Sequence, residues 1–329
     1  MEAMMALAIL LFVSFGICQA VATPSVVVQD GSGSFRTIND ALRAAPSYSR
    51  EKVIIVIKKG IYYEQVTVGQ EKTNIVLIGE GVENTVISGS KSVATGFGLQ
   101  ETATVGILGN GFMAQGITFK NTAGLNGRQA VALLTSANYV TFYQCRFMGY
   151  QDTLYAKYGI AFFRDCEIIG TVDFIFGDAA SIFQNCIIRA RQPLPEQYIT
   201  ITAQGRTTTS RGTGFIFQNC SVYTEELHQA KTKVQCYLGR PWKDFSRTVF
   251  MQSFMDAGVN PAGWIQWEMQ ARVHPYFAEY ANRGPGAGTT RVQWSIIIKS
   301  PTEASQFTLR NFLQGGTWIP PAVPRYLDL

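Results

Sequence analysis

The chain has 329 residues, with 28 Lys and Arg against 23 Asp and Glu, and a formal net charge of +5. Charged residues make up only 16% of the chain, below the roughly 25% of typical domains. Because no Lys/Arg run or basic-aromatic interleaving occurs, the composition argues against nucleic-acid binding. A weak positive charge instead favours an anionic partner such as an acidic polysaccharide.

The first 22 residues have the pattern of a secretory signal peptide. The stretch 3–18 is apolar or small throughout, and it is too short for the roughly 20 residues that span a bilayer. It is followed by Ala20-Val21-Ala22, which fits the A-x-A cleavage pattern. We therefore expect a secreted, extracellular protein with no membrane span, in which residues 23–329 form a single domain.

The elements that follow predict an all-β chain with one early helix. Thr37 precedes the helical stretch 38–45, and Pro46 stops it, so a short N-terminal helix could cap the open end of a solenoid. From Val53 onward, short β-branched or aromatic runs alternate with Gly, Asn and Asp, as strands and turns do. The clearest runs are 53–58, 74–78, 117–121, 140–147, 161–168, 181–188 and 214–222, and a second short helix is expected over 302–313.

One stretch repeats itself after 21 residues. Phe142, Cys145, Gly149 and Asp152 recur in register as Phe163, Cys166, Gly170 and Asp173. A repeat of this length is typical of a stacked solenoid, in which equivalent residues of adjacent coils lie roughly 4.8 Å apart. The repeat therefore predicts a parallel β-helix with two neighbouring carboxylates. Carboxylates that close cannot both ionise cheaply, which prepares one acid and one base.

Four cysteines share the setting Phe-x-x-Cys, and the oxidising compartment suggests disulfides between stacked equivalents. We predict the pairs Cys145–Cys166 and Cys186–Cys220, although Cys166–Cys186 joins adjacent coils equally well. Cys236 is left as a free thiol. With no C-x-x-C pair and only His228 and His274 in the chain, we expect no metal site.

The same shortage of histidine argues against a Ser-His-Asp hydrolase. Neither histidine lies beside a plausible nucleophile, and no G-x-S-x-G motif occurs. Carboxylate chemistry supported by amides and an arginine remains.

Five sequence blocks resemble the plant pectin methylesterases (pectinesterases), in family order over nearly all of the mature chain. The blocks are Gly60–Glu64 (GIYYE), Gln129–Leu133 (QAVAL), Gly149–Leu154 (GYQDTL), Asp173–Gly177 (DFIFG) and Leu238–Trp242 (LGRPW). The resemblance implies a single-stranded right-handed parallel β-helix that hydrolyses the methyl esters of polygalacturonate and releases methanol.

The resemblance also implies a role for each site residue. Asp173 would be the nucleophile, and Arg240 would hold it ionised and oriented. Asp152 would protonate the methoxide leaving group and later act as base toward water.

Amide and aromatic side chains complete the implied site. Gln129 and Gln151 would donate hydrogen bonds to the oxyanion, each worth about 2.7–4 kcal/mol. Trp242 would stack on a sugar ring, with Trp264 as a second candidate and Phe174 as a further substrate contact. Gln129 and Arg240 would also bind substrate.

Some positions depart from the family pattern. Leu99 and Gln100 stand where Thr and Phe are usual, Arg128 stands where His is common, and Cys236 is unusual before the LGRPW block. We expect the form without an inhibitor-like pro-region, active as a monomer in the cell wall without a cofactor. Methyl-esterified homogalacturonan is the expected substrate, and a proteinaceous pectin methylesterase inhibitor is a candidate partner.

Two alternatives remain at the level of sequence. A polygalacturonase-like β-helix glycoside hydrolase also uses paired Asp, but inverting enzymes need carboxyl groups about 6.5–9.5 Å apart, more than one coil spacing. A non-catalytic wall-binding homologue would have lost a catalytic residue, and none is lost. The calcium-binding Asp cluster expected of a pectate lyase is not found.

Overall fold

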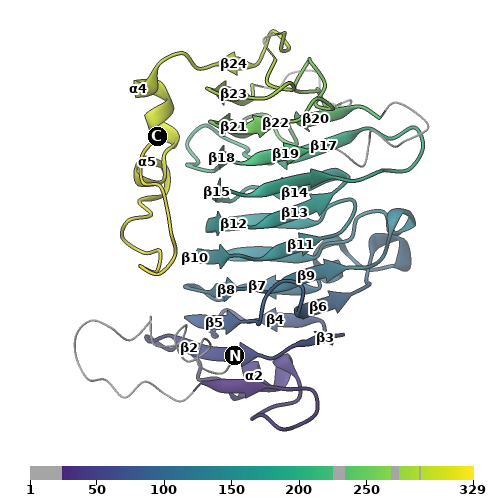
Figure 1. The fold of residues 1–329 in the computed structure, drawn as a ribbon, viewed down its shortest axis with the longest axis vertical. Helices are drawn as coiled ribbons and strands as arrows, with labels where there is room; N and C mark the ends of the chain where they lie inside the picture. The colour runs from purple at the N-terminus through teal and green to yellow at the C-terminus, as the bar shows by residue number, and fades with distance from the viewer. Residues whose placement is uncertain (1–23, 225–233, 268–273, 289) are drawn as a thin grey trace.

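The computed structural model describes residues 24–224, 234–267, 274–288 and 290–329. The predicted signal peptide and His228 lie outside these ranges. Within them, the strands form two sheets in which every pairing is parallel, stacked along one long axis (Figure 1). The predicted all-β solenoid is therefore confirmed.

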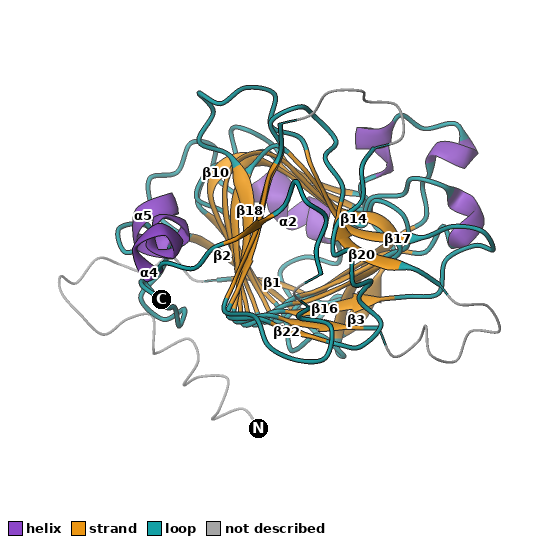
Figure 2. Cartoon of the chain, turned by 90° about the horizontal axis from the view of Figure 1, so that it is seen from above, coloured by secondary structure: helices purple, strands orange, loops and turns teal. Residues whose placement is uncertain are grey.

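The larger sheet is bent into two faces, because its longest strands turn a corner. Strand β10 (Leu133–Tyr143) pairs first with β7 (Val105–Ile107) and then with β8 (Met113–Gln115). Strand β12 (Leu154–Arg164) continues both faces in the same way. With the smaller sheet as the third side, the coils enclose a three-sided tube (Figure 2).

We call the first of these sides the cleft face, the second the covered face and the third the small sheet. Besides β10 and β12, the cleft face holds β4 (Val66–Val68), β7, β14 (Val172–Gly177), β17 (Ile199–Gln204) and β20 (Cys236–Gly239). The covered face holds β1 (Ser25–Val27), β2 (Val53–Ile57), β5 (Ile75–Ile78), β8, β15 (Ala180–Gln184), β18 (Gly214–Gln218), β21 (Arg247–Met251), β23 (Tyr276–Tyr280) and β24 (Ile296–Ile297). The small sheet holds β3 (Gly60–Tyr62), β6 (Thr85–Gly89), β9 (Thr118–Asn121), β11 (Arg146–Met148), β13 (Glu167–Gly170), β16 (Ile187–Ala190), β19 (Ser221–Tyr223) and β22 (Phe254–Met255).

The register confirms the 21-residue repeat. Leu133 pairs with Leu154, and Leu154 pairs with Ile175, each 21 residues on. Phe142 pairs directly with Phe163. The interval that the sequence shows is thus the length of one coil.

Several predicted strands are in fact two strands separated by a corner. Gln144, Asp165, Asn185 and Asn219 each have a φ between 51° and 55°, a left-handed conformation that Asn and Asp tolerate better than most residues. Three of their side chains form a polar ladder, in which Asn185 donates to Asp165 over 2.6 Å and Asn219 donates to Asn185 over 3.4 Å. The apolar runs 140–147, 161–168, 181–188 and 214–222 therefore bend at these residues.

The interior of the tube is a stack of aromatic rings. Five phenylalanines on five successive coils lie with consecutive ring centroids 4.3–5.0 Å apart and ring planes within 10° of each other. All five are fully buried. They are Phe142, Phe163, Phe183, Phe217 and Phe250.

The predicted disulfides are not formed, and all five described cysteines are buried free thiols. Adjacent coils are close enough for a disulfide, but the thiols point at backbone carbonyls. Cys166 Sγ lies 3.3 Å from the carbonyl of Arg164, and Cys220 Sγ lies 3.3 Å from that of Phe183. Cys166 interacts with both Cys145 and Cys186, and Cys186 interacts with both Cys166 and Cys220, so the thiols form a row and not two pairs. Cys236 is free as expected, and burial raises its pKa to about 12.

Helices cover the N-terminal end and one side of the tube. The predicted capping helix is α2 (Ile38–Ala44), in which Thr37 accepts a hydrogen bond from the Asp40 amide and Ile38 and Leu42 are buried. The helix expected over 302–313 is instead three pieces, α4 (Pro301–Ala304), η4 (Ser305–Phe307) and α5 (Leu309–Leu313), which lie along the covered face (Figure 1). None of the helices in the described ranges is long and apolar enough to cross a bilayer.

Candidate active site

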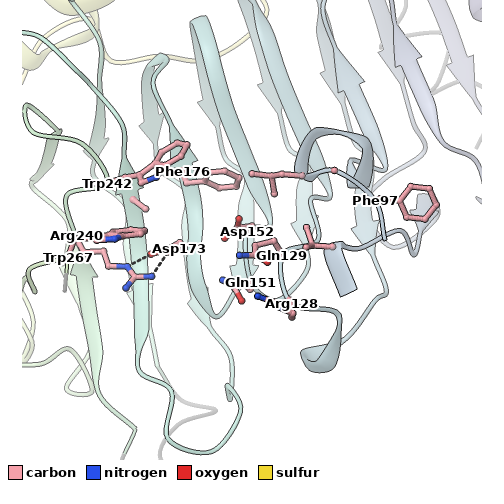
Figure 3. A pocket seen from close by; sticks show the side chains of 14 residues that line it. Phe97, Arg128, Gln129, Gln151, Asp152, Asp173, Phe176, Arg240, Trp242 and Trp267 are labelled. Atoms are coloured by element: carbon pink, nitrogen blue, oxygen red, sulfur yellow. Dashed lines mark hydrogen bonds and ion pairs between the residues drawn. The ribbon is translucent and has the colours of Figure 1, made fainter. Parts of the chain in front are cut away.

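A cleft of about 480 Å³ opens on the cleft face and contains most of the predicted site residues (Figure 3). Its floor comes from the coils of β10, β12, β14 and β17. Its rim comes from β20 and from the 3-10 turns η1 (Val93–Thr95), η2 (Leu99–Thr102) and η3 (Leu125–Gly127). The lining residues are Val93, Phe97, Gly98, Leu99, Arg128, Gln129, Gln151, Asp152, Asp173, Phe176, Ala203, Arg240, Trp242 and Trp267.

Asp173 is directed into the cleft by a β-bulge. Val172 pairs with Thr200 and Ile175 with Thr202, so β14 has one residue more than β17 between these points. Asp173 lies in this bulge with a φ of 51°. Bulges redirect side chains and are frequent beside active sites.

The carboxylate of Asp173 is bound by Arg240 in a two-pronged ion pair. Arg240 Nε donates to Oδ1 over 2.8 Å and Nη2 donates to Oδ2 over 2.6 Å. Both side chains are mostly buried, at 14% and 8% exposure. Burial lowers the pKa of Arg240, but the hydrogen bond and the charge of Asp173 raise it by more. The net result is a pKa above the ordinary value of arginine.

Arg240 is itself held by two aromatic residues. Its Nη1 donates to the Tyr198 hydroxyl over 3.1 Å, and its guanidinium carbon lies 4.0 Å from the ring centroid of Trp267. Stacking on an indole is a favourable setting for guanidinium. Two aromatic side chains therefore hold in place the guanidinium that pairs with Asp173.

Asp152 lies one coil before Asp173 and in a different electrostatic setting. It precedes β12 with a φ of 64°, and its amide donates to the carbonyl of Val172 over 3.1 Å. Burial raises the pKa of Asp152 well above its ordinary value of 3.8, the charge of Asp173 raises it further, and Arg240 opposes the shift. The predicted division into one protonated and one ionised carboxyl thus has a physical basis.

Gln129 and Gln151 line the cleft beside Asp152, as Figure 3 shows. The Ala130 amide donates to the Gln151 carbonyl over 3.2 Å, which joins the two backbone segments. Among the described residues, neither side-chain amide is engaged in a hydrogen bond, and the Gln129 Oε1 atom is buried without a partner. Both side-chain amides can therefore donate hydrogen bonds to an oxyanion in the cleft.

An aromatic wall closes one end of the cleft, and only part of it was predicted. Trp242 lines the cleft as expected, with its ring centroid 6.0 Å from that of Phe176. Phe176 in turn stacks on Tyr155 at 4.2 Å. Trp267 completes the wall.

The predictions for Trp264 and Phe174 are wrong. Trp264 is 1% exposed and packs against Phe277 at 4.6 Å, inside the tube. Phe174 is fully buried and covers Gly170, where an added Cβ would lie 2.2 Å from that of Phe174. The bulge at Asp173 interrupts the alternation of the strand, so Phe174 and Ile175 both join the core and Phe176 faces the cleft.

The sequence reasoning missed several residues of the site. Trp267 lies three residues beyond Trp264 in the same segment, and Tyr198 and Thr200 flank the start of β17. The one available signal concerns Thr200. In Thr200-Ile201-Thr202, threonine alternates with an apolar residue, which predicts a strand with one polar side. Leu99, which replaces a usual Thr, does line the cleft, and Phe97 lies beside it. No group of His, Cys, Asp or Glu in the described residues is arranged to hold a metal ion.

Comparison with known proteins identifies the family. A profile described as Pectinesterase matches residues 24–316. The chain belongs to the pectinesterase family. Pectinesterase 2 of Citrus sinensis is 46% identical over 300 residues, which cover 90% of this chain and 58% of that relative. A probable pectinesterase/pectinesterase inhibitor 32 of Arabidopsis thaliana is 45% identical, over 90% of this chain and 57% of its own length. The chain thus spans somewhat more than half the length of these pectinesterases.

Solved structures agree with the fold. Pectin methylesterase from carrot superposes with a TM-score of 0.91 at 42% identity, over 94% of this chain and all of that chain. A pectin methylesterase in complex with a hexasaccharide gives a TM-score of 0.76 at 26% identity, over 93% of this chain and all of its own. These likenesses confirm the right-handed parallel β-helix. Pectinesterase membership does not favour the glycoside hydrolase alternative.

Proposed function

We propose that the protein is a pectin methylesterase, a carboxylic ester hydrolase that converts pectin and water to pectate and methanol. The observation that carries the proposal is the pair of unlike carboxyl groups: Asp173, bound by Arg240, beside a buried Asp152 whose pKa is raised. An ester hydrolase of this type needs one anionic nucleophile and one proton donor. The likeness to pectinesterases along the chain supports the same assignment.

In the first half of the reaction, the Asp173 carboxylate attacks the ester carbonyl carbon of a methylated galacturonate. The carbonyl oxygen becomes an oxyanion that accepts hydrogen bonds from the amides of Gln129 and Gln151. As the intermediate collapses, the carbon–methoxy bond breaks and Asp152 gives its proton to the methoxide, which leaves as methanol. An acyl-enzyme on Asp173 remains.

In the second half, ionised Asp152 takes a proton from water, and the resulting hydroxide attacks the acyl carbon. The bond from Asp173 to that carbon breaks, which releases a free galacturonate. Both aspartates return to their starting states, so one water is consumed and one methanol formed per cycle. The rate should fall as the pH rises through the raised pKa of Asp152, because the ionised form has no proton to give.

The cleft fits a sugar polymer in its shape and its lining. Trp242, Trp267 and Phe176 give flat apolar surfaces for the faces of sugar rings, and the cleft is open to solvent beside Arg128. The relative solved with a hexasaccharide has the same fold. We therefore propose methyl-esterified homogalacturonan as the substrate.

We also propose that residues 1–22 are removed on secretion, that residues 23–329 form the catalytic domain, and that it acts as a monomer in the cell wall. The names of several relatives couple a pectinesterase to a pectinesterase inhibitor, which supports a proteinaceous inhibitor as partner. N-terminal sequencing of the secreted protein should begin at Thr23.

The decisive experiment is methanol release from highly methyl-esterified pectin by the purified protein, with titration of the carboxyl groups formed. Wild type should release one methanol for each new carboxyl group, and Asp173→Asn should release none. Chain scission without methanol would point to the glycoside hydrolase. Binding of pectin without either product would point to a wall-binding homologue.

A further inference from the structure

Thr200 contacts the proposed nucleophile twice, although nothing in the ester chemistry described above uses it. Its side chain lies on β17, directly opposite Val172 on β14, and it is fully buried. The Asp173 amide donates to Thr200 Oγ1 over 3.0 Å, and Thr200 Oγ1 donates to Asp173 Oδ1 over 2.5 Å. One hydroxyl therefore links the backbone of Asp173 to its own carboxylate.

The direction of the Thr200 hydroxyl hydrogen follows from these two contacts. A hydroxyl has one hydrogen to give and two lone pairs to accept with. Since the Asp173 N–H already points at Oγ1, the hydroxyl hydrogen is left for the carboxylate. A distance of 2.5 Å is typical of an O–H donating to an anion, and such bonds are roughly twice as strong as neutral ones.

Thr200 also makes the two carboxylate oxygens unequal. The fork of Arg240 gives one hydrogen bond to Oδ1 and one to Oδ2, so with Arg240 alone the oxygens would be equivalent. The bond from Thr200 brings Oδ1 to two donors and leaves Oδ2 with one. A carboxylate oxygen has about two in-plane acceptor sites, so Oδ2 keeps a free lone pair while those of Oδ1 are engaged.

We propose that Thr200 is a positioning residue that fixes Asp173 so that Oδ2, and not Oδ1, attacks the ester carbon. The inference rests on the proposed methylesterase function. A bond forms between Oδ2 and the ester carbon, the bond from that carbon to the methoxy oxygen breaks, and the proton from Asp152 completes methanol. Thr200 keeps its own proton throughout.

A plain structural role for Thr200 can be separated from this one with a neighbour on the same strand. Thr202 is also fully buried on β17, and its hydroxyl donates to the Leu238 carbonyl over 2.9 Å. It makes no hydrogen bond with Asp173. Thr202→Val thus removes a buried hydroxyl of the same kind two residues away, which makes it the matched control for Thr200→Val.

The experiment measures kcat and KM for methanol release from methyl-esterified pectin with wild type, Thr200→Val, Thr200→Ser and Thr202→Val. Thr200→Val should lower kcat about 100-fold, as a small misplacement of a reacting group does. KM should stay within about twofold, because Thr200 lies beneath Asp173 and not against the polymer. Thr200→Ser keeps the hydroxyl, so its kcat should lie within about threefold of wild type. The kcat of the control Thr202→Val should lie within the same range.

A crystal structure of Thr200→Val gives the second readout. The Asp173 carboxylate should be turned relative to its position in the wild type, with the thermal unfolding midpoint close to that of Thr202→Val. Should the valine variant not fold, Thr200→Ala is compared with Thr202→Ala by the same two measurements.

Other outcomes would overturn the inference. They are a kcat of Thr200→Val within twofold of wild type, equal losses in the Val and Ser variants, equal losses in Thr200→Val and Thr202→Val, or an unmoved carboxylate. An inactive wild type is a different result, because it removes the methylesterase function itself and with it the role of Thr200.

Discussion

The phenylalanine stack and the aspartate pair arise from the same repeat, yet they have opposite energetic consequences. Phe142 and Phe163 are 21 residues apart and lie ring on ring inside the tube. Asp152 and Asp173 are also 21 residues apart, but they meet in the cleft, where burial and mutual repulsion raise the pKa of Asp152. Identical side chains on adjacent coils stabilise the fold when they are aromatic, because their rings pack. When they are carboxyl groups, their repulsion shifts a pKa.

The surroundings of the two regions differ accordingly. Each phenylalanine stacks on that of the next coil, and the stack continues through Phe183, Phe217 and Phe250 although the coils there differ in length. The aspartates need partners from outside the repeat: Arg240, which directly follows β20, and Thr200 from β17. Substitutions in the cleft should therefore affect activity more than stability. Substitutions in the phenylalanine stack should affect stability more than activity.

The sharpest test of this difference is to neutralise each aspartate in turn. Asp173→Asn should lower kcat by about 10⁴-fold or more, as loss of a nucleophile does, and should form no acyl-enzyme. Asp152→Asn should lower kcat by about 10²–10⁴-fold, the range for a lost general acid. With a nitrophenyl ester, whose leaving group needs no proton, the Asp152 variant should lose much less. Equal losses for both variants on methyl and nitrophenyl esters would contradict the division of roles.

A cavity in the phenylalanine stack should affect stability and leave the chemistry of the cleft intact. Phe183→Ala should lower the free energy of unfolding by about 3–5 kcal/mol, because it removes a fully buried ring between two stacked neighbours. Denaturant unfolding measures the change. Tyr63→Ala is the control, since Tyr63 is 79% exposed and its loss should stay within about 0.5 kcal/mol. A loss below about 1 kcal/mol for Phe183→Ala would show that the stack is not where the stability lies.

The two nearby tryptophans allow the comparison to be made within one segment. Trp267→Ala should lower kcat/KM about tenfold, because a stacked indole contributes roughly 0.5–2 kcal/mol to holding a guanidinium, and should leave the unfolding midpoint nearly unchanged. Trp264→Ala should lower stability by about 3–5 kcal/mol, since its indole is in the core. Steady-state kinetics, measured below the unfolding midpoint of the less stable variant, give kcat/KM for both variants. Thermal unfolding gives their midpoints. The opposite pattern would place Trp264 in the cleft.

The smallest effect concerns the pH dependence of stability. Because the pKa of Asp152 is raised above its ordinary value of 3.8, the folded protein keeps a proton that the unfolded chain releases. Stability is therefore highest below pH 3.8 with respect to this group and falls as the pH rises through the raised pKa. Asp152→Asn removes this pH-dependent loss of stability, so the variant should become more stable relative to wild type as the pH rises. The measurement is the difference between their thermal unfolding midpoints, in which 1 kcal/mol corresponds to about 2–4 °C. A difference between the two proteins that does not change with pH would show that Asp152 is not shifted.

The sequence alone determined whatever depends on local spacing. The 21-residue interval fixes the coil, and the coil places Asp152 beside Asp173 and Cys145 beside Cys166, because parallel strands stack equivalent positions. Thr37 and Pro46 bound the capping helix for equally local reasons. The five family blocks then supplied Arg240, Gln129, Gln151 and Trp242, which the cleft brings together.

Only the tertiary structure decided which way individual side chains point and what they bind. Asp173 faces the cleft, and Phe174 after it points into the core. The bulge sends Ile175 into the core as well and Phe176 to the cleft, since one extra residue shifts every later side chain of a strand to the other face. Cys145 and Cys166 are neighbours as the spacing requires, yet the structure holds them as thiols. Thr200 and Trp267 reach the site from segments 27 and 94 residues beyond Asp173. Such contacts depend on how later coils close over earlier ones, and no local pattern encodes that.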